Sequence, residues 1–290
     1  WLSGVVSGLN LACRVVDGGV ITATPVYPPF LSAPKLSGRE LTSVPLKLTD
    51  DGWRMDLEAM QAALKPDTRL WLLCHPHNPV GRAWSDEELR AFAGFCRRHD
   101  LIVCSDEIHC DLILDAERRH LPLACVDDEI ARRSITLMAP SKTFNIPGLA
   151  CAFAVIPDAG LRRRFTGAAR GIVPDVNVLG FVAAEAAFRE GAEWHRGLID
   201  TLRRNRDRVE AAVAAMPGLA VTHVEATYLA WIDARGLGVD DPVSFFEAAG
   251  VGLSNGADFG LPGWVRLNFG CPGATLEAAL QRMEQACRQR

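Results

Sequence analysis

Short apolar runs alternate with amphipathic stretches along the first two thirds of the chain. This alternation is typical of α/β proteins, in which strands and helices follow one another. The runs are apolar at consecutive positions, which indicates strands buried on both faces of a largely parallel sheet. We predict five such strands, at residues 20–24, 69–74, 101–104, 134–138 and 150–156.

The stretch between the second and third predicted strands carries a clear helix signal. Ser85 is followed three residues later by Glu88, which is the capping-box pattern found at the start of many helices. Apolar side chains then recur at helical spacing, at Leu89, Phe92 and Cys96. Residues 69–104 are therefore expected to form a strand, helix, strand unit.

The pattern changes after residue 174, where long helical stretches replace the alternation. We expect helices at residues 176–189, 193–216, 242–249 and 275–289, with strands at 220–224, 228–232 and 265–268. These elements predict a smaller α+β unit at the end of the chain. We place the domain boundary near residue 195, which gives a large domain over residues 1–194 and a small domain over 195–290.

The second long helix carries four arginines close together, at positions 203, 204, 206 and 208. Such a cluster could bind an anion, but acidic residues are interspersed among the arginines. Alternating charges favour a solvated helix face over an anion site.

Composition and charge narrow the classes of protein that the chain can represent. Hydrophobic residues make up 49% of it, and 31 basic against 35 acidic residues leave a net charge of −4. No basic field is present that would hold a nucleic acid. No apolar stretch is long enough to cross a membrane, no secretory signal opens the chain, and the nine cysteines form no CxxC pair. We therefore expect a cytoplasmic enzyme or binding protein with reduced cysteines.

Three polar residues follow predicted strands, and they carry different chemistry. Asn78, Asp106 and Lys142 are 28 and 36 residues apart, which leaves room for about one helix and one strand between them. Ligands of open α/β sheets bind at the carboxyl ends of strands, so the three side chains are expected to share one crevice. Taken singly, each has a structural alternative, namely a turn, a helix cap and a surface lysine.

The residues around these three positions favour a site. Two prolines and a glycine surround Asn78 within residues 75–81 and fix an irregular backbone there. Lys142 lies between a strand and a Pro-Gly turn, where partial burial would lower the pKa of the amine. His75 with His77, or His109 with Cys110, could be read as metal ligands, but neither pair has structural-zinc spacing. We expect no metal.

Seven stretches of the chain carry a family resemblance, and they occur in the family order. They are GVVSGLN at 4–10, TPVYPPF at 24–30, LCHPHNPVGR at 73–82, SDEIHCD at 105–111, APSKTFNIPGL at 139–149, TYLAW at 227–231 and VRLNFGCP at 265–272. The chain resembles the fold-type I pyridoxal-phosphate enzymes of the class I and II aminotransferase superfamily. Within that superfamily it is most similar to the C-S lyases of the cystathionine β-lyase type.

The resemblance implies a three-layer α/β/α large domain that binds pyridoxal 5'-phosphate. In it, Lys142 would form the Schiff base with the cofactor aldehyde and carry the Cα proton of the substrate. Asp106 would pair with the protonated pyridine nitrogen. Asn78 would hydrogen-bond the phenolic oxygen of the ring and contact the substrate, and His109 would lie near the same oxygen.

The resemblance also assigns residues to the ring face, the phosphate and the substrate. Tyr27 would stack on the ring, and the start of a helix at Val5 and Val6 would offer backbone N–H groups to the phosphate, with help from Ser141. Arg266 would clamp the substrate α-carboxylate in a bidentate manner. Its place on an apolar strand agrees with this, because a buried guanidinium needs an anionic partner.

The activity implied by the resemblance is β-elimination from cystathionine or a related L-cysteine S-conjugate. An aminotransferase remains open, because the same ring and lysine serve both reactions. A non-catalytic regulatory protein is the alternative of another class. The resemblance further implies a homodimer with a small-molecule amino-acid substrate, and it implies that the family's N-terminal segment is missing ahead of Trp1.

Overall fold

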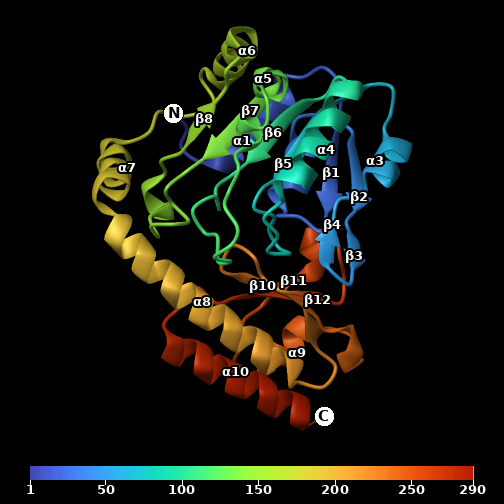
Figure 1. Cartoon of the computed structure of the whole chain (residues 1–290), viewed down its shortest axis with the longest axis vertical. Helices are drawn as coiled ribbons and strands as arrows, with labels where there is room; N and C mark the ends of the chain where they lie inside the picture. The colour runs from blue at the N-terminus through green and yellow to red at the C-terminus, as the bar shows by residue number, and fades with distance from the viewer. Residues whose placement is uncertain (290) are drawn as a thin grey trace.

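A six-stranded sheet forms the centre of the molecule in the computed structural model, which describes residues 1–289 (Figure 1). The strand order is β2-β1-β5-β6-β7-β8; the strands from β2 to β7 pair in parallel, and β8 joins antiparallel to β7. The bounds are β1 (Gly19–Thr24), β2 (Leu41–Pro45), β5 (Thr68–Cys74), β6 (Ile102–Asp106), β7 (Ser134–Met138) and β8 (Phe153–Val155).

All five predicted strands are present, with three differences in detail. The strand β6 continues to Asp106, so this residue ends the strand instead of following it. The last strand, β8, covers only part of the predicted 150–156. The edge strand β2 was not predicted, because it is only partly buried and lacks a continuous apolar run.

Helices cover both faces of this sheet, as an α/β/α arrangement requires. Alternate residues of β5 point to opposite faces, so that Leu70 and Leu72 belong to one apolar core while Trp71 and Leu73 belong to the other. The first core also contains side chains of α1 (Val5–Arg14), α2 (Pro29–Leu36) and α6 (Ala159–Ala169), and the second contains those of α3 (Leu57–Ala63), α4 (Asp86–Arg98) and α5 (Asp128–Arg132).

The predicted capping box begins α4. The Ser85 hydroxyl accepts a hydrogen bond from the Glu88 N–H at 3.2 Å, and the Glu88 carboxylate accepts one from the Ser85 N–H at 2.8 Å. The apolar face of the helix, including Leu89, Phe92 and Cys96, is fully buried. The strand, helix, strand prediction is confirmed for β5, α4 and β6.

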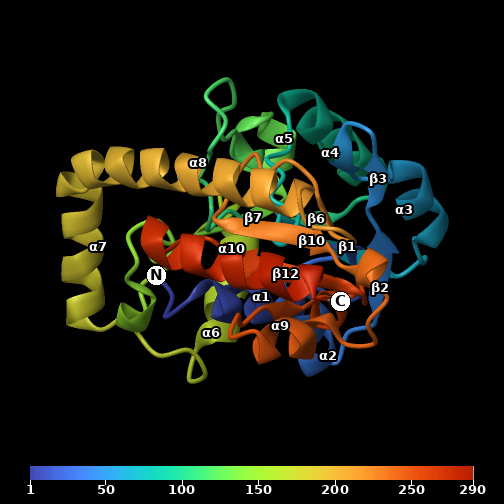
Figure 2. The ribbon, with the colours of Figure 1, turned by 90° about the horizontal axis from the view of Figure 1, so that it is seen from below.

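A second, antiparallel sheet lies beyond the carboxyl edge of the first. Its order is β11-β12-β10-β9, with β9 (Ala220–Val221), β10 (Leu229–Asp233), β11 (Ser254–Asn255) and β12 (Trp264–Asn268). The helices α8 (Ala192–Ala214) and α10 (Gly273–Arg288) lie side by side against it, and α9 (Pro242–Ala248) is close by (Figure 2). The strands and α-helix not yet named are the hairpin β3 (Lys47–Thr49) and β4 (Gly52–Arg54), and α7 (Val178–Glu190).

We refer to the elements up to α7 as the large-sheet unit and to those from α8 onward as the small-sheet unit. The predicted domain boundary near residue 195 falls within the first turn of α8. The division into domains 1–194 and 195–290 remains a prediction.

The expectation that the arginines of α8 form a solvated face is wrong for Arg206. Its side chain is mostly buried, because it reaches Asp115 at 2.7 Å and also the carbonyl oxygen of Val224. Arg203 donates to the carbonyl oxygen of Leu114 at 2.6 Å. The sequence pattern missed these contacts because their partners lie far away along the chain.

Two further features bear on the sequence predictions. Eight cysteines are free, and most of these are buried, while Cys125 is exposed; they lie at positions 13, 74, 96, 104, 110, 125, 151 and 271. Among residues 1–289, no helix has the length and apolar character needed to cross a membrane.

Candidate functional site

A cavity of about 450 Å³ lies where β1, β5, β6 and β7 end. Parallel pairing brings Cys74, at the end of β5, level with Asp106 at the end of β6. The small-sheet unit closes the cavity from the other side. All nine residues that sequence analysis put forward line it: Val5, Val6, Tyr27, Asn78, Asp106, His109, Ser141, Lys142 and Arg266. The structure thus brings the predicted set together, while their individual roles remain predictions.

Lys142 follows β7 by four residues, in the loop that enters a Pro-Gly turn. Burial lowers the pKa of its amine below the usual value, and the nearby positive charge of Arg266 lowers it further. The carboxylate of Asp106 acts in the opposite direction. A lysine with a lowered pKa spends more time as the neutral amine, which is the form that attacks a carbonyl or accepts a proton.

Asp106 is a buried acid at the cavity wall. Burial raises the pKa of its carboxyl group to about 7, although a hydrogen bond from the Ile108 N–H at 3.1 Å opposes this shift. Among residues 1–289, no basic side chain forms an ion pair with it. A carboxyl group in this situation is suited to a cationic or proton-donating ligand group.

The residue next to Asp106 belongs to a separate buried network that does not line the cavity. The Glu107 carboxylate accepts hydrogen bonds from the Ser105 hydroxyl at 2.8 Å and the Leu123 N–H at 3.0 Å, and it lies 2.7 Å from His120 Nε2. These contacts fasten the loop at residues 120–123 to the end of β6. They hold the backbone on both sides of Asp106 in place.

Asn78 lies in the loop after β5 and contacts the small-sheet unit directly. Its side-chain oxygen accepts a hydrogen bond from Arg266 at 2.9 Å, across 188 residues of sequence. The loop is further tied down by His77, whose Nε2 lies 2.8 Å from the carbonyl oxygen of Pro25. Asn78 is therefore held at a fixed place between the two units.

Arg266 projects from β12 into the cavity and is half-buried. It donates to Asn78 and, at 3.2 Å, to the Ser254 hydroxyl, and its guanidinium lies 4.6 Å from the ring centre of Phe259. Its buried Nε has no hydrogen-bond partner, and no carboxylate pairs with it in the described part of the chain. The guanidinium is thus free to bind an anionic ligand.

His109 and the first residues of α1 also line the cavity. The imidazole of His109 is buried, and burial, with the charges of Lys142 and Arg266, lowers its pKa to about 3, so it is neutral at physiological pH. Val5 and Val6 begin α1, whose first N–H groups lack helical partners.

Sequence reasoning did not single out Tyr228 and Asn268, which also line the cavity, although both lie inside stretches that carry the resemblance.

The sequence model of the family described as "Aminotransferase class I and II" matches residues 1–283. The chain belongs to this family. Among described residues of this family member, no group of three or more His, Cys, Asp or Glu side chains is arranged to hold a metal ion.

Two curated relatives of this aminotransferase-family chain are similar over most of its length. Cystathionine beta-lyase PatB of Bacillus subtilis (strain 168) is 35% identical, over 98% of this chain and 76% of PatB. Protein MalY of Escherichia coli (strain K12) is 35% identical, over 93% of this chain and 70% of MalY.

Two solved structures are similar to the chain over at least 99% of its length. The crystal structure of OvoB is 50% identical with a TM-score of 0.98, covering 100% of this chain and 77% of OvoB. Cystalysin from Treponema denticola, which contains a pyridoxal 5'-phosphate cofactor, is 32% identical with a TM-score of 0.93, covering 99% and 76% of the two chains. The predicted family and fold class are confirmed.

The raised pKa of Asp106 predicts a specific pH dependence of stability in the cofactor-free protein. In the unfolded chain an aspartate titrates near pH 4, as a rough reference. The stability that Asp106 contributes as a neutral acid is therefore present below that pH and is lost as the pH rises through about 7.

Replacing Asp106 with Asn, which does not titrate, should stabilise the protein relative to wild type increasingly between about pH 4 and about pH 7, and the gain should then stay level. The expected gain is at most about 1.4 kcal/mol per pH unit. Urea unfolding of both cofactor-free proteins across this range measures it. A difference in unfolding free energy that stays constant with pH would contradict the assignment.

Proposed function

We propose that the chain is a pyridoxal-phosphate-dependent C-S β-lyase, which cleaves cystathionine or a related L-cysteine S-conjugate to a thiol, pyruvate and ammonia. The observation that carries the proposal is the meeting of Asn78, Asp106, Lys142 and Arg266 in one cavity. The similarity to cystathionine beta-lyase PatB supports the choice of reaction.

The cavity offers a partner for each part of the cofactor. Lys142 supplies an amine for the aldehyde, and Asp106 supplies a buried carboxyl group, without a basic partner among residues 1–289, for the pyridine nitrogen. The N–H groups at Val5 and Val6, together with Ser141, suit the phosphate. When bound, pyridoxal phosphate supplies an electron sink that stabilises negative charge at the substrate Cα.

The protein's own groups then carry out two tasks. Arg266 and Asn78 bind the α-carboxylate and orient the substrate, so that its Cα–H bond faces Lys142. The neutral amine of Lys142 removes the Cα proton, the electron pair forms the Cα–Cβ double bond, and the C–S bond breaks. The thiolate takes up a proton, and water hydrolyses the released aminoacrylate to pyruvate and ammonia.

Transamination is the second candidate, because other relatives are aminotransferases. Probable N-succinyldiaminopimelate aminotransferase DapC of Mycobacterium tuberculosis (strain CDC 1551 / Oshkosh) is 33% identical over 79% of this chain and 57% of DapC. The same residues would serve, with Lys142 again moving the Cα proton and with the electron pair at Cα retained by the cofactor system instead of expelling the thiolate.

We further propose that the protein is a cytoplasmic homodimer. The free cysteines agree with a reducing compartment. The helix α7 supports the dimer, because Val178, Leu179, Phe181, Val182 and Phe188 are all exposed on it. Figure 2 shows this helix at one side of the molecule, at a steep angle to α8. An apolar face of this kind is typical of an interface between subunits.

The lyase proposal predicts that the holoprotein releases pyruvate and free thiol in equal amounts from L-cystathionine, without any keto acid. The variant Lys142→Ala should lose at least about a thousandfold in kcat, because it removes the base. Coupled assays for pyruvate and thiol measure both. Formation of a new amino acid only after a keto acid is added would instead establish transamination.

The dimer proposal predicts a sedimentation coefficient for two copies of the chain. A charge placed in the apolar face, as in Val182→Glu, should shift the population to monomer, because a buried unpaired charge is costly. The matched change Glu185→Gln, on the same helix, should leave the dimer intact. A wild-type monomer at micromolar concentration would contradict the proposal.

A further inference from the structure

One segment of the small-sheet unit leaves its own sheet and lies against the large-sheet unit. It comprises residues 223–227, between β9 and β10. Four backbone hydrogen bonds to carbonyl oxygens hold it there: from Ala226 N–H to Gly81 at 2.9 Å, from Thr227 N–H to Leu112 at 2.8 Å, and from the N–H groups of Leu114 and Asp115 to Glu225 at 2.8 Å and 3.3 Å. The backbone of the segment is therefore docked on the large-sheet unit through residues 225–227.

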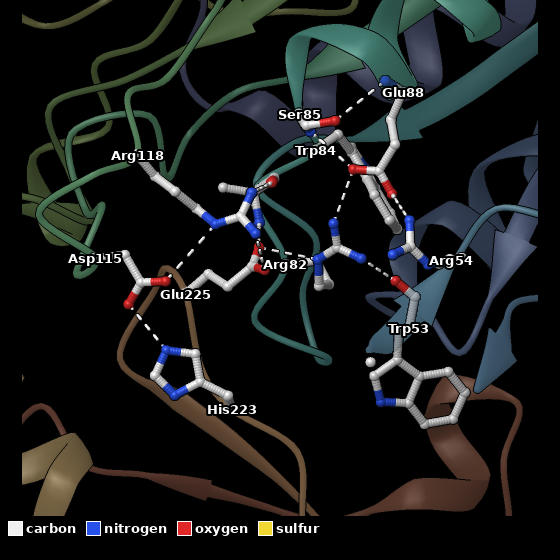
Figure 3. A network of polar contacts seen from close by, with 12 residues as sticks. Trp53, Arg54, Arg82, Trp84, Ser85, Glu88, Asp115, Arg118, His223 and Glu225 are labelled. Atoms are coloured by element: carbon white, nitrogen blue, oxygen red, sulfur yellow. Dashed lines mark hydrogen bonds and ion pairs between the residues drawn. The ribbon is translucent and has the colours of Figure 1, made fainter. Parts of the chain in front are cut away.

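The side chain of Glu225 joins the two units in the middle of this segment (Figure 3). It is 8% exposed, and its Oε2 accepts hydrogen bonds from Arg82 Nε at 2.9 Å and from the Ala83 N–H at 3.0 Å. Its Oε1 lies 2.6 Å from the guanidinium of Arg118. Both carboxylate oxygens are thus paired with groups of the large-sheet unit.

Arg82 is buried with a full set of partners. Its side chain is 6% exposed, and besides Glu225 it binds Glu88 at 2.8 Å and the carbonyl oxygen of Trp53. Three hydrogen-bond acceptors around a guanidinium fix its orientation. Its contact with Glu225 therefore fixes the docked segment in a defined register.

Neither end of this ion pair is far from the cavity. Arg82 follows Asn78 by four residues, and Glu225 precedes Tyr228 by three. The strand β10 begins at the next residue, and its Trp231 pairs with Arg266 on β12. The Arg82 to Glu225 contact therefore joins the Asn78 loop to the docked segment, which leads into β10, and the Asn78 to Arg266 contact joins the same loop to β12, the neighbour of β10.

The close approach at Gly81 shows how little room the junction leaves. Gly81 has a φ of +73°, and a Cβ added to it would lie 2.8 Å from a methyl group of Val224. The backbone of the Asn78 loop thus packs directly on the docked segment. A displacement of the docked segment would therefore displace the Asn78 loop as well.

We propose that Glu225 is a positioning residue for recognition of the substrate α-carboxylate. By holding the docked segment on Arg82, it sets the place of Arg266 relative to Asn78, which are the two groups assigned to the carboxylate. This inference rests on the proposed function for the identity of the ligand. Glu225 does not line the cavity itself, so it acts only through these residues.

The test compares two ligands of the holoprotein that differ only in the carboxylate. L-Alanine has no leaving group on Cβ, and ethylamine is the same molecule without its carboxylate. Their binding is followed by the change in cofactor absorbance. In Glu225→Gln, which keeps the size of the side chain and removes its charge, the affinity for L-alanine should fall about tenfold. The affinity for ethylamine should stay within about twofold.

Steady-state kinetics should show a matching loss of substrate affinity. The KM for L-cystathionine should rise about tenfold in Glu225→Gln while kcat stays within about twofold, because the weakened carboxylate contact lowers the binding of substrate and transition state equally. Glu225→Asp, which keeps the charge, should restore part of the loss. Glu284→Gln, which removes an exposed ion pair on α10, is the matched control and should change neither ligand.

Equal weakening of both ligands in Glu225→Gln, or no change in either, would overturn the proposal. If that variant fails to fold, Arg118→Gln removes one of the partners of Glu225 and should still lower the affinity for L-alanine selectively, by about threefold. A wild-type holoprotein that binds L-alanine but releases no pyruvate from L-cystathionine would count against the lyase proposal alone, since the comparison of the two ligands does not depend on elimination.

Discussion

Parallel pairing of the central strands is the constraint on which the site depends. Because β5 and β6 run side by side in register, Cys74 and Asp106 arrive together at one edge of the sheet, and the loop that carries Lys142 leaves the sheet beside them. Residues far apart in sequence thus meet without any long-range signal of their own. The small-sheet unit only has to cover this edge, which it does with Arg266 and Tyr228.

Asp106 and Arg266 line the same cavity, but they do not form an ion pair with each other. Asp106 is buried without a basic ion-pair partner, and Arg266 is half-buried without a carboxylate, within the part of the chain that the structure describes. Both arrangements cost stability in the protein alone, and each is relieved by a ligand group of the complementary kind. Lys142 lines the same cavity, and its lowered pKa follows from burial and from the charge of Arg266.

The sequence was informative wherever the physical signal is local. Buried strands have continuous apolar runs, and the capping box is contained within four residues, so these elements were predicted well. Asn78, Asp106 and Lys142 could be proposed from their places after predicted strands, and the other cavity residues were proposed because they lie in short stretches that carry the family resemblance. Edge strand β2 is partly polar and gave no such signal, and the role of Glu225 depends on Arg82, 143 residues away. Contacts of that kind leave no pattern in a single sequence.

The most direct test of this account is to find which lysine binds the cofactor. The chain has only four lysines, at positions 35, 47, 65 and 142. Borohydride reduction of the protein loaded with pyridoxal phosphate, followed by peptide mass spectrometry, should place a single modification on Lys142. Modification at Lys35, Lys47 or Lys65, or no defined modification, would contradict the assignment of the cavity as the active site.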